Sequence, residues 1–235
     1  MTIENDLLIR TKNLTKVYNQ KLGSNLKALD GINLDVFSGE MLSIIGRSGS
    51  GKSTLLNIIG TLDTPTSGEI FLEGKNLKKY SDNELSLLRR HKIGFIFQTF
   101  NLIPILTVSE NIGLSLYHHE ISKIKKEEKV NEMLKFFEIF DKKSSLPHEL
   151  SVGQQQKVAI ARALVKNPLI IIADEPTGEM DPIAGSEIAK KFVDLKKEFK
   201  VTTIIASHGS FPYQKADRKI FLQDGKLVTK KDAGY

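Results

Sequence analysis

The chain has 235 residues, of which 40% are hydrophobic and 26% are charged, and its formal net charge is +6. Such a length and composition are those of a soluble globular protein with a full α/β core, and the absence of cysteine excludes disulfides, iron–sulfur clusters and thiolate zinc sites. No run approaches the roughly 18 apolar residues that cross a bilayer. The start, MTIENDLLIR, is acidic and too poor in apolar residues for a secretory signal, so we expect a cytoplasmic protein.

The first predicted elements are strands. The segments LLIRTKNLT and INLDV alternate apolar and polar residues, and turn-forming stretches separate them. This pattern predicts a small antiparallel sheet. Further along, strand-like and helix-like segments alternate, which predicts an α/β layer architecture.

The most informative segment is GRSGSGKST, which follows the apolar strand MLSII and opens the predicted helix KSTLLNII. It satisfies the phosphate-loop pattern G-x-x-x-x-G-K-[ST] in the expected strand-to-helix context. The glycines let backbone N–H groups point at phosphate oxygens, and the helix N-terminus adds its positive dipole end. Lys52 is expected to neutralise the β- and γ-phosphates, and Ser53 to ligate Mg²⁺. The predicted loop comprises Gly46, Arg47, Ser48, Gly49, Ser50, Gly51, Lys52, Ser53 and Thr54.

The middle of the chain is predicted to be mostly helical. After a short strand, EIFLEG, capping boxes predict helix starts at Ser81 and Thr107, and nearly everything from Thr107 to Leu164 has a helical pattern. The lysines between Lys123 and Lys143 alternate with acidic residues, which favours a solvated helical face over a nucleic-acid surface. A core stripe at helical spacing is predicted for Val130, Met133, Leu134 and Phe137.

Candidate catalytic residues follow apolar strands. The strand LIIIA leads into Asp174 and Glu175, and in phosphoryl transfer one carboxylate holds Mg²⁺ while a second group orients the attacking water. We assign the binding of Mg²⁺ to Asp174 and the orientation of the attacking water to Glu175. His208 follows VTTIIAS and could hydrogen-bond the γ-phosphate, although a lone histidine there is more often structural. Gln98 follows IGFIF; its amide could touch Mg²⁺ or the attacking water, but alone it is nearly uninformative.

Two further local signals lie in the C-terminal half. Asp181 is predicted to cap a helix that has Pro182 at its first position. The segment IFLQDGKLV is predicted to form a hairpin that turns on Asp224-Gly225.

The segment LSVGQQQKVAIARAL resembles the signature helix of ATP-binding cassette (ABC) proteins. The other motifs then fall in the order of that family: Tyr18, the phosphate loop, Gln98, this segment, the carboxylate pair, the EMDP around Asp181 and His208. The resemblance spans almost the whole chain. It implies one ABC ATPase domain over residues 1–235: a P-loop NTPase (RecA-like) core with an N-terminal antiparallel β subdomain and an α-helical signature subdomain at about 99–164.

The resemblance also implies roles for site residues. Tyr18 would stack on the adenine of ATP, and His208 would grip the γ-phosphate. Asp181 would bridge two copies of the chain. The start of the signature helix would reach the γ-phosphate bound to the second copy, through Ser151, Gly153 and Gln154. The implied assembly is an ATP-dependent, head-to-tail homodimer that binds ATP and Mg²⁺.

Within that family, FQTFNLIPILTVSENI and SVGQQQKVAIARAL look most like the macrolide-exporter and lipoprotein-releasing group. Members of that group work with a separate integral-membrane permease, so the chain would sit peripherally on the cytoplasmic face of the cell membrane. Three positions depart from the family pattern. Val152 replaces a second glycine, Glu179-Met180 replaces a polar-Leu pair, and Gly209 replaces an acid.

The expected work is therefore ATP hydrolysis that drives export or lipoprotein or lipid extraction. Two other ABC functions stay open: a mechanotransmitting ATPase that controls an envelope enzyme, and a soluble ATPase that acts on ribosomes or DNA. The soluble type usually carries two cassettes or a long coiled-coil insertion, which this chain lacks. A P-loop GTPase is disfavoured because no Asn-Lys-x-Asp motif is present.

Overall fold

A computed structural model describes residues 6–19, 25–208 and 215–234 of the chain. Its first sheet contains β1 (Leu7–Asn19), β2 (Asn25–Phe37), β4 (Ser67–Leu72) and β5 (Lys75–Asn76). The strand order is β2-β1-β4-β5 and each pairing is antiparallel. The antiparallel sheet predicted for the N-terminal region is confirmed, and it extends further than the two segments that predicted it.

The second sheet carries the chemistry. It contains β3 (Met41–Ile45), β6 (Ile93–Ile96), β7 (Ile170–Asp174), β8 (Thr202–Ser207), β9 (Arg218–Gln223) and β10 (Lys226–Val228). The order is β10-β9-β3-β8-β7-β6, and every pairing is parallel except that of β10 with β9. Asp224 and Gly225 both have positive φ, as a tight hairpin turn requires, which confirms the predicted hairpin.

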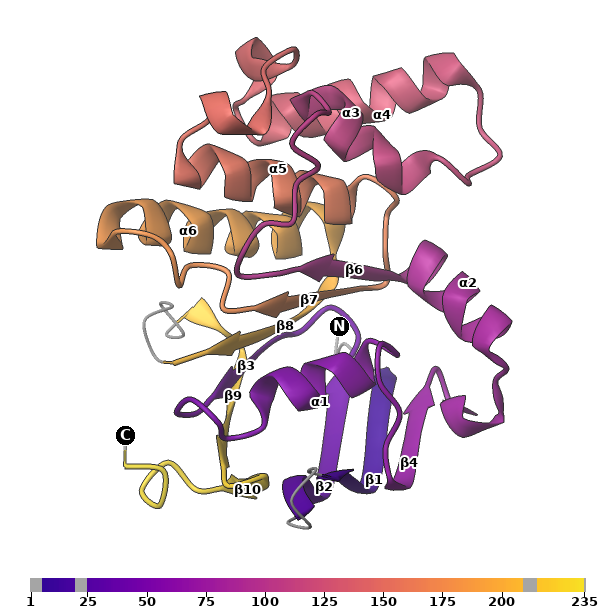
Figure 1. Ribbon diagram of the computed structural model, residues 1–235, viewed down its shortest axis with the longest axis vertical. Coiled ribbons are helices and arrows are strands. Elements are labelled where there is room, and N and C mark those ends of the chain that lie inside the picture. Colours follow the sequence, from indigo (N-terminus) through magenta and orange to yellow (C-terminus); the bar gives the residue numbers. More distant parts are fainter. Residues whose placement is uncertain (1–5, 20–24, 209–214, 235) are drawn as a thin grey trace, which may run out of the picture.

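Helices cover both faces of this second sheet (Figure 1). They are α1 (Lys52–Ile59), α2 (Asp82–Lys92), α3 (Val108–Gly113), α4 (Lys123–Phe136), α5 (Val152–Leu164) and α6 (Pro182–Phe199). Single 3₁₀ turns occupy Leu77–Lys79, Leu114–Leu116, Phe140–Lys142 and Pro147–Glu149. Helix α1 lies between the two sheets, α5 and α6 cover the opposite face, and α3 and α4 lie beyond α5. This layering confirms the predicted α/β fold class.

The predicted helix starts are confirmed, and side chains supply their caps. Ser81 and Thr107 each form a complete capping box, at the starts of α2 and α3. Asp181 Oδ1 accepts hydrogen bonds from the backbone N–H groups of Ile183 and Ala184 at the start of α6. These bonds satisfy N–H groups that have no partner within the helix.

Two apolar clusters form the interior. One lies among the antiparallel sheet, α1 and the parallel sheet, and the other joins α3, α4, α5 and α6 to the opposite face of the parallel sheet. The second cluster contains the stripe of Val130, Met133, Leu134 and Phe137, all buried as predicted. Among the residues that the structure describes, none forms a helix that is both long and apolar enough to cross a bilayer.

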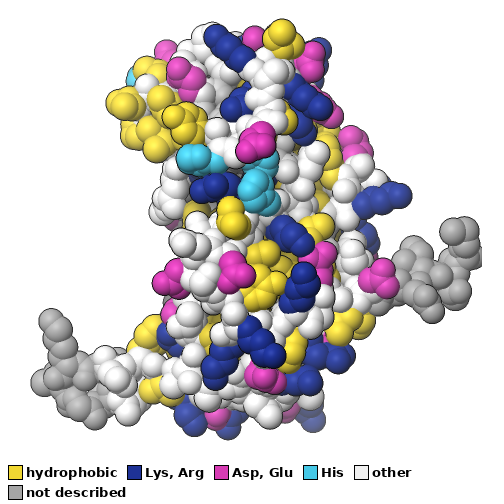
Figure 2. All heavy atoms as spheres, turned by 90° about the vertical axis from the view of Figure 1, so that its right-hand side faces the viewer, with side chains coloured by type: hydrophobic (Ala, Val, Ile, Leu, Met, Phe, Trp, Pro, Cys, Tyr) yellow, Lys and Arg dark blue, Asp and Glu magenta, His cyan; other side chains and the backbone are white. Residues whose placement is uncertain are grey.

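Charges on the outer surface are mixed. On the face shown in Figure 2, acidic side chains lie between the basic ones, and an apolar patch lies beside histidine side chains near the top. Ion pairs of Lys143 with Glu127 and of Lys191 with Glu138 neutralise part of the basic charge near α4 and α6. This alternation is consistent with the solvated face expected for the lysine-rich segment.

Core packing near α4 yields a stability prediction. Phe137 is fully buried, so Phe137→Ala should lower the free energy of unfolding by about 3–5 kcal/mol through lost burial and a residual cavity. Phe140, which is 45% exposed, is the matched control, and Phe140→Ala should cost about 1 kcal/mol or less. Urea unfolding followed by circular dichroism measures both. Equal losses in the two variants would contradict this account of the core.

Candidate functional site

The candidate site forms where three neighbouring parallel strands end. Strands β3, β8 and β7 are adjacent, so the segments that follow them emerge at one edge of the sheet. The backbone N–H of Gly46 donates to Ser207 O at 3.4 Å, and that of Glu175 donates to Ala206 O at 3.0 Å. The phosphate loop, His208 and the Asp174-Glu175 pair therefore meet at this edge.

The loop conformation requires glycine at two positions. Gly51 has φ +104°, and a Cβ there would lie 2.4 Å from Ala28 O. A Cβ on Gly46 would lie 2.3 Å from Leu222 O. On its outer side the loop is held by the β9–β10 hairpin, because Gly225 N donates to Ser50 O at 3.0 Å. The loop is thus packed closely against backbone on two sides.

Lys52 lies inside this loop with only 4% of its surface exposed. Its Nζ donates to Gly46 O at 2.9 Å and to Arg47 O at 3.1 Å, and it lies 3.7 Å from Glu175 Oε1. Burial lowers the pKa of the Lys52 ammonium, and the Glu175 and Asp174 carboxylates oppose that shift. The ammonium is held where a phosphate group would enter.

Glu175 and His208 are in direct contact. His208 Nε2 lies 2.5 Å from Glu175 Oε1, while its Nδ1 lies 3.1 Å from Gly46 O and 3.3 Å from Lys52 Nζ. Glu175 has φ +49°, a region that non-glycine residues occupy at a cost of about 1–3 kcal/mol. The fold therefore holds this carboxylate in a costly backbone conformation beside the lysine of the loop.

One cleft gathers most of the residues predicted to bind the nucleotide. Tyr18, Glu175 and His208 line it with Ser48, Gly49, Gly51, Lys52, Ser53 and Thr54. Gly46, Arg47 and Ser50 instead line a neighbouring cavity on the outer side of the loop. Leu26, Lys27, Ala28 and the Asp224-Gly225 turn complete the first cleft, and no local sequence pattern had placed them there.

Asp174 and Ser53, the residues expected to ligate Mg²⁺, have side-chain oxygens that fit this role. Asp174 Oδ1 is buried and has no hydrogen-bond partner within the described part of the chain. Ser53 lies in the first turn of α1 with an exposed side chain. Mg²⁺ is typically held by one or two such protein oxygens together with substrate phosphates, so the residues present are compatible with this ion.

Gln98 lies apart from the cleft. Its Nε2 donates to Glu179 Oε1 at 2.8 Å, and it is not among the residues that line the phosphate cleft. The next residues, Phe100 and Asn101, have positive φ, and their carbonyl groups accept hydrogen bonds from Arg162 of α5 at 2.7 and 2.6 Å. The structure thus turns Gln98 toward Glu179 and does not bring it into the phosphate cleft with Lys52 and Ser53.

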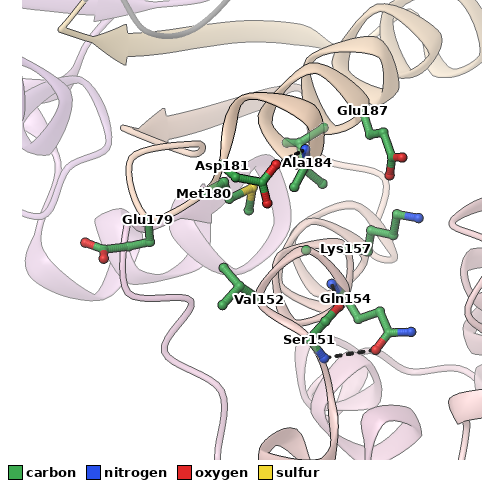
Figure 3. Close-up of a pocket in the computed structure, with 11 residues that line it drawn as sticks. Ser151, Val152, Gln154, Lys157, Glu179, Met180, Asp181, Ala184 and Glu187 are labelled. Atoms are coloured by element: carbon green, nitrogen blue, oxygen red, sulfur yellow. Dashed lines mark hydrogen bonds between the residues drawn. The ribbon is translucent and has the colours of Figure 1, made fainter.

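A second cleft lies at the start of α5 (Figure 3). It is lined by Ser151, Val152, Gly153, Gln154, Lys157, Glu179, Met180, Asp181, Ala184, Glu187 and Ile188. Of the described residues, none lines both this cleft and the phosphate cleft. The predicted γ-phosphate ligands of the signature segment are thus brought together with Asp181, but not with the chain's own phosphate loop.

Capping already engages some of these side chains. Ser151 Oγ accepts from Gln154 N at 3.3 Å, and Gln154 Oε1 accepts from Ser151 N at 3.0 Å. The Ser151 hydroxyl proton remains available to a ligand. Val152 is 42% exposed and projects toward the loop of Glu179 and Met180 (Figure 3). Gly209, the third departure from the family pattern, lies outside the described residues.

Buried polar contacts that the sequence did not reveal hold the segment between Gln98 and α3. Asn111 is fully buried; its Oδ1 accepts from Ile103 N at 2.8 Å, and its Nδ2 donates to Leu106 O at 2.8 Å. With Arg162 on the other side, these bonds fix an otherwise irregular loop. Neither Asn111 nor Arg162 stood out in the sequence, because their importance lies in contacts made in the folded chain and no local sequence pattern indicates such contacts.

This fold and site define a P-loop ATPase, and the comparisons give its family. A family model described as ABC transporter matches residues 29–178, which is more than half of the chain. The chain belongs to the ABC transporter family, and it is an ABC-type ATPase that binds ATP.

Individual relatives agree with this assignment. The ABC transporter ATP-binding protein MJ0796 of Methanocaldococcus jannaschii is 44% identical over 225 residues, covering 94% of this chain and 95% of that protein. YvrO of Bacillus subtilis is 44% identical over 222 residues, covering 94% of this chain and 96% of that protein. A solved dimeric structure of the MJ0796 cassette has a TM-score of 0.86 at 42% identity, covering 94% and 97% of the two chains. A second dimeric structure, of its post-hydrolysis state bound to ADP and Pi, has the same scores and coverage.

The position of Lys52 yields a binding prediction. Lys52→Ala should weaken Mg-ATP binding by at least about 100-fold, because charge-assisted hydrogen bonds to the phosphates would be lost. Isothermal titration calorimetry measures the affinity, and Lys125→Ala, on the exposed side of α4, is the matched control. Wild-type affinity in Lys52→Ala would contradict the assignment of the loop.

Proposed function

We propose that the chain is the ATP-hydrolysing subunit of a transporter, in which two copies close around two ATP molecules and drive an integral-membrane permease. The work would be export or lipoprotein or lipid extraction, as in the macrolide-exporter and lipoprotein-releasing group. The observation that carries this proposal is the separation of the phosphate cleft from the signature cleft within one chain.

The separation implies a second copy. The N-terminus of α5 presents the hydroxyl group of Ser151 and the backbone of Gly153, an arrangement suited to an anion, but no phosphate loop of the same chain faces it. A symmetric head-to-tail pair would place each signature cleft over the ATP held by the other copy. The dimeric structures of MJ0796, a relative with the same fold, support the pairing of two copies.

Hydrolysis would be divided among the residues of the phosphate cleft. Lys52 would exchange its carbonyl partners for phosphate oxygens, and Tyr18 would receive the adenine. Glu175 would orient and deprotonate the attacking water, while His208 would turn from Glu175 to the γ-phosphate. Mg²⁺, when bound, neutralises charge on the phosphates; Ser53 and Asp174 would hold it, with Gln98 reaching the ion or the water after leaving Glu179. Asp181 would bridge the two copies.

The segment after Gln98 is the proposed link to the permease. Ile105 is 84% exposed and Ile103 is 41% exposed, although both lie in a loop that Arg162 and Asn111 hold in place. A fixed apolar surface of this kind suits a short amphipathic helix from a membrane partner. Because Arg162 of α5 holds this loop, movement of α5 as the two copies close would carry the surface with it.

The hydrolysis assignment yields a prediction on Glu175. Glu175→Gln keeps the shape of the side chain but cannot accept a proton, so turnover should fall by at least about 100-fold while ATP binding persists. The variant should be a dimer with ATP and a monomer with ADP, as measured by light scattering after gel filtration. Unchanged turnover would show that another group activates the water. A monomer under both conditions would remove the head-to-tail assembly.

The permease proposal is tested in membranes. Tagged Glu175→Gln protein with ATP, incubated with detergent-solubilised membranes of its own source, should retain an integral-membrane protein. Adding Ile105→Asp should abolish that retention without changing ATP affinity. Ile124 on α4 is the matched control, since it is 73% exposed, and adding Ile124→Asp should leave the retention intact.

The outcome separates the candidate functions. Retention of a permease would support the transporter, and retention of a membrane protein together with an envelope enzyme would favour the mechanotransmitting alternative. Recovery of ribosomal proteins or DNA alone would overturn the membrane proposal.

A further inference from the structure

Tyr18, the residue proposed to receive adenine, is tied to an acidic residue at the far end of α1. Tyr18 Oη donates to Asp63 Oδ2 at 2.7 Å, across 45 positions of the sequence. Asp63 follows the C-terminal end of α1, the helix that begins with the phosphate loop. The contact therefore connects the strand that carries Tyr18 to the element that carries the phosphate site.

Lys16 completes the arrangement. Its Nζ pairs with Asp63 Oδ1 at 2.6 Å, donates to Thr64 O at 2.8 Å and lies 4.9 Å from the centroid of the Tyr18 ring. Asp63 Oδ1 also accepts from Thr64 N at 2.7 Å. Both oxygens of Asp63 are thus engaged, and Lys16 occupies a position over the tyrosine ring.

The nucleotide cleft lies on the other side of this cluster. Tyr18 lines the cleft together with Thr54, whereas Lys16 and Asp63 are not among its lining residues. The ring consequently has one surface supported by Lys16 and another available to a ligand. This is the geometry of a stacking platform whose back is fixed.

The charge states agree with these hydrogen bonds. Burial opposes ionisation of Asp63, but the bonds from Lys16, Tyr18 and Thr64 outweigh it and lower the pKa of this carboxyl. Burial, followed by the bond to Asp63, raises the pKa of the Tyr18 phenol, so the hydroxyl remains a donor.

We propose that Asp63 is a positioning residue for ATP: it fixes Tyr18 relative to α1, so that the base-stacking surface stands at a set distance from the phosphate loop. The proposal rests on the adenine role given to Tyr18 under the proposed function. Asp63 would act through preorganisation, because a tyrosine ring that is already held in place loses less conformational freedom when a base stacks on it. Asp63 does not line the nucleotide cleft, so it would contact neither the base nor the phosphates directly.

The first test separates base recognition from phosphate recognition. Asp63→Ala should weaken ATP binding by about fivefold, the value of one hydrogen bond of ordinary strength, and should raise the KM for ATP with kcat unchanged. The affinity for inorganic triphosphate, measured by competition against radiolabelled ATP, should stay within about twofold of wild type. Asp63→Asn, which keeps acceptor oxygen for the tyrosine hydroxyl, should recover most of the loss.

Glu73→Ala is the matched control. Glu73 pairs with Lys92 at the surface next to the same sheet but away from Tyr18, so its loss should leave both affinities unchanged. Tyr18→Phe should weaken ATP binding at least as much as Asp63→Ala, because it also removes the side-chain hydrogen bond of Tyr18 with Thr54, and adding Asp63→Ala to it should cost little more, because the Tyr18–Asp63 hydrogen bond is already absent.

Several outcomes would overturn the proposal. Equal weakening of ATP and of inorganic triphosphate in Asp63→Ala would show that Asp63 supports the phosphate loop in general. Full additivity with Tyr18→Phe would show that the two residues act separately, and wild-type KM in Asp63→Ala would remove the role. If wild-type protein itself bound no Mg-ATP, the proposed function would fail first, and this proposal with it.

Discussion

The parallel pairing of β3, β8 and β7 is the constraint on which the rest of the site depends. Ile45 is paired with Ser207 and Asp174 with Ala206, so the three strands end in step. A shift of one residue in β7 would exchange the faces on which its side chains lie and would turn Asp174 away from the loop. Helix α1 covers one face of the sheet, and α5 and α6 cover the other. The polar groups proposed to bind phosphate therefore lie beyond the ends of the strands. The phosphate loop, the carboxylates and His208 therefore share one edge.

Within that edge, Lys52 determines how the other groups are arranged. A buried ammonium is costly unless it is paired, and here the loop carbonyls, His208 and Glu175 surround it. The carboxylate proposed to activate water thus also compensates the lysine before a phosphate arrives. If a phosphate replaced Glu175 as the partner of Lys52, and His208 also turned away, the Glu175 carboxylate would become available to water. One exchange of contacts would then couple substrate binding to the readiness of the base.

The sequence predicted those parts of the fold that local patterns control. The strand MLSII, the helix that opens at Lys52, the caps at Ser81 and Thr107 and the Asp224-Gly225 turn are each specified by residues within a few positions of one another, and all were confirmed. The family order of motifs led to the assigned site residues, of which Tyr18, Glu175 and His208 line the phosphate cleft and Ser151, Gly153 and Asp181 line the signature cleft, while their roles stay predictions. The contacts that could not be predicted join distant positions, such as Tyr18 with Asp63 or Gln98 with Glu179. Nothing in the neighbourhood of either partner identifies the other, because the pairing exists only after the sheets and helices have packed.

The Gln98–Glu179 contact gives a physical meaning to one departure from the family pattern. Glu179 lines the signature cleft, and the loop that Gln98 opens is held by Arg162 of the signature helix, so one chain of contacts joins the second cleft to the segment proposed to sense the γ-phosphate. A hydrogen bond to a carboxylate is stronger than one to a neutral acceptor, so under the role proposed for Gln98, Glu179 would bias its side chain away from the nucleotide more strongly than an uncharged residue would. A state in which Gln98 reached the nucleotide would first have to break that contact, and the apparent affinity for ATP would then be proportional to the fraction of chains in which Gln98 is free. A second copy that engages Glu179 across the interface would remove the bias, and because such coupling is reciprocal, Gln98 bound at the nucleotide would favour the interface in return. In this arrangement an acidic residue beside an anion site would disfavour premature closure of the two copies without preventing it.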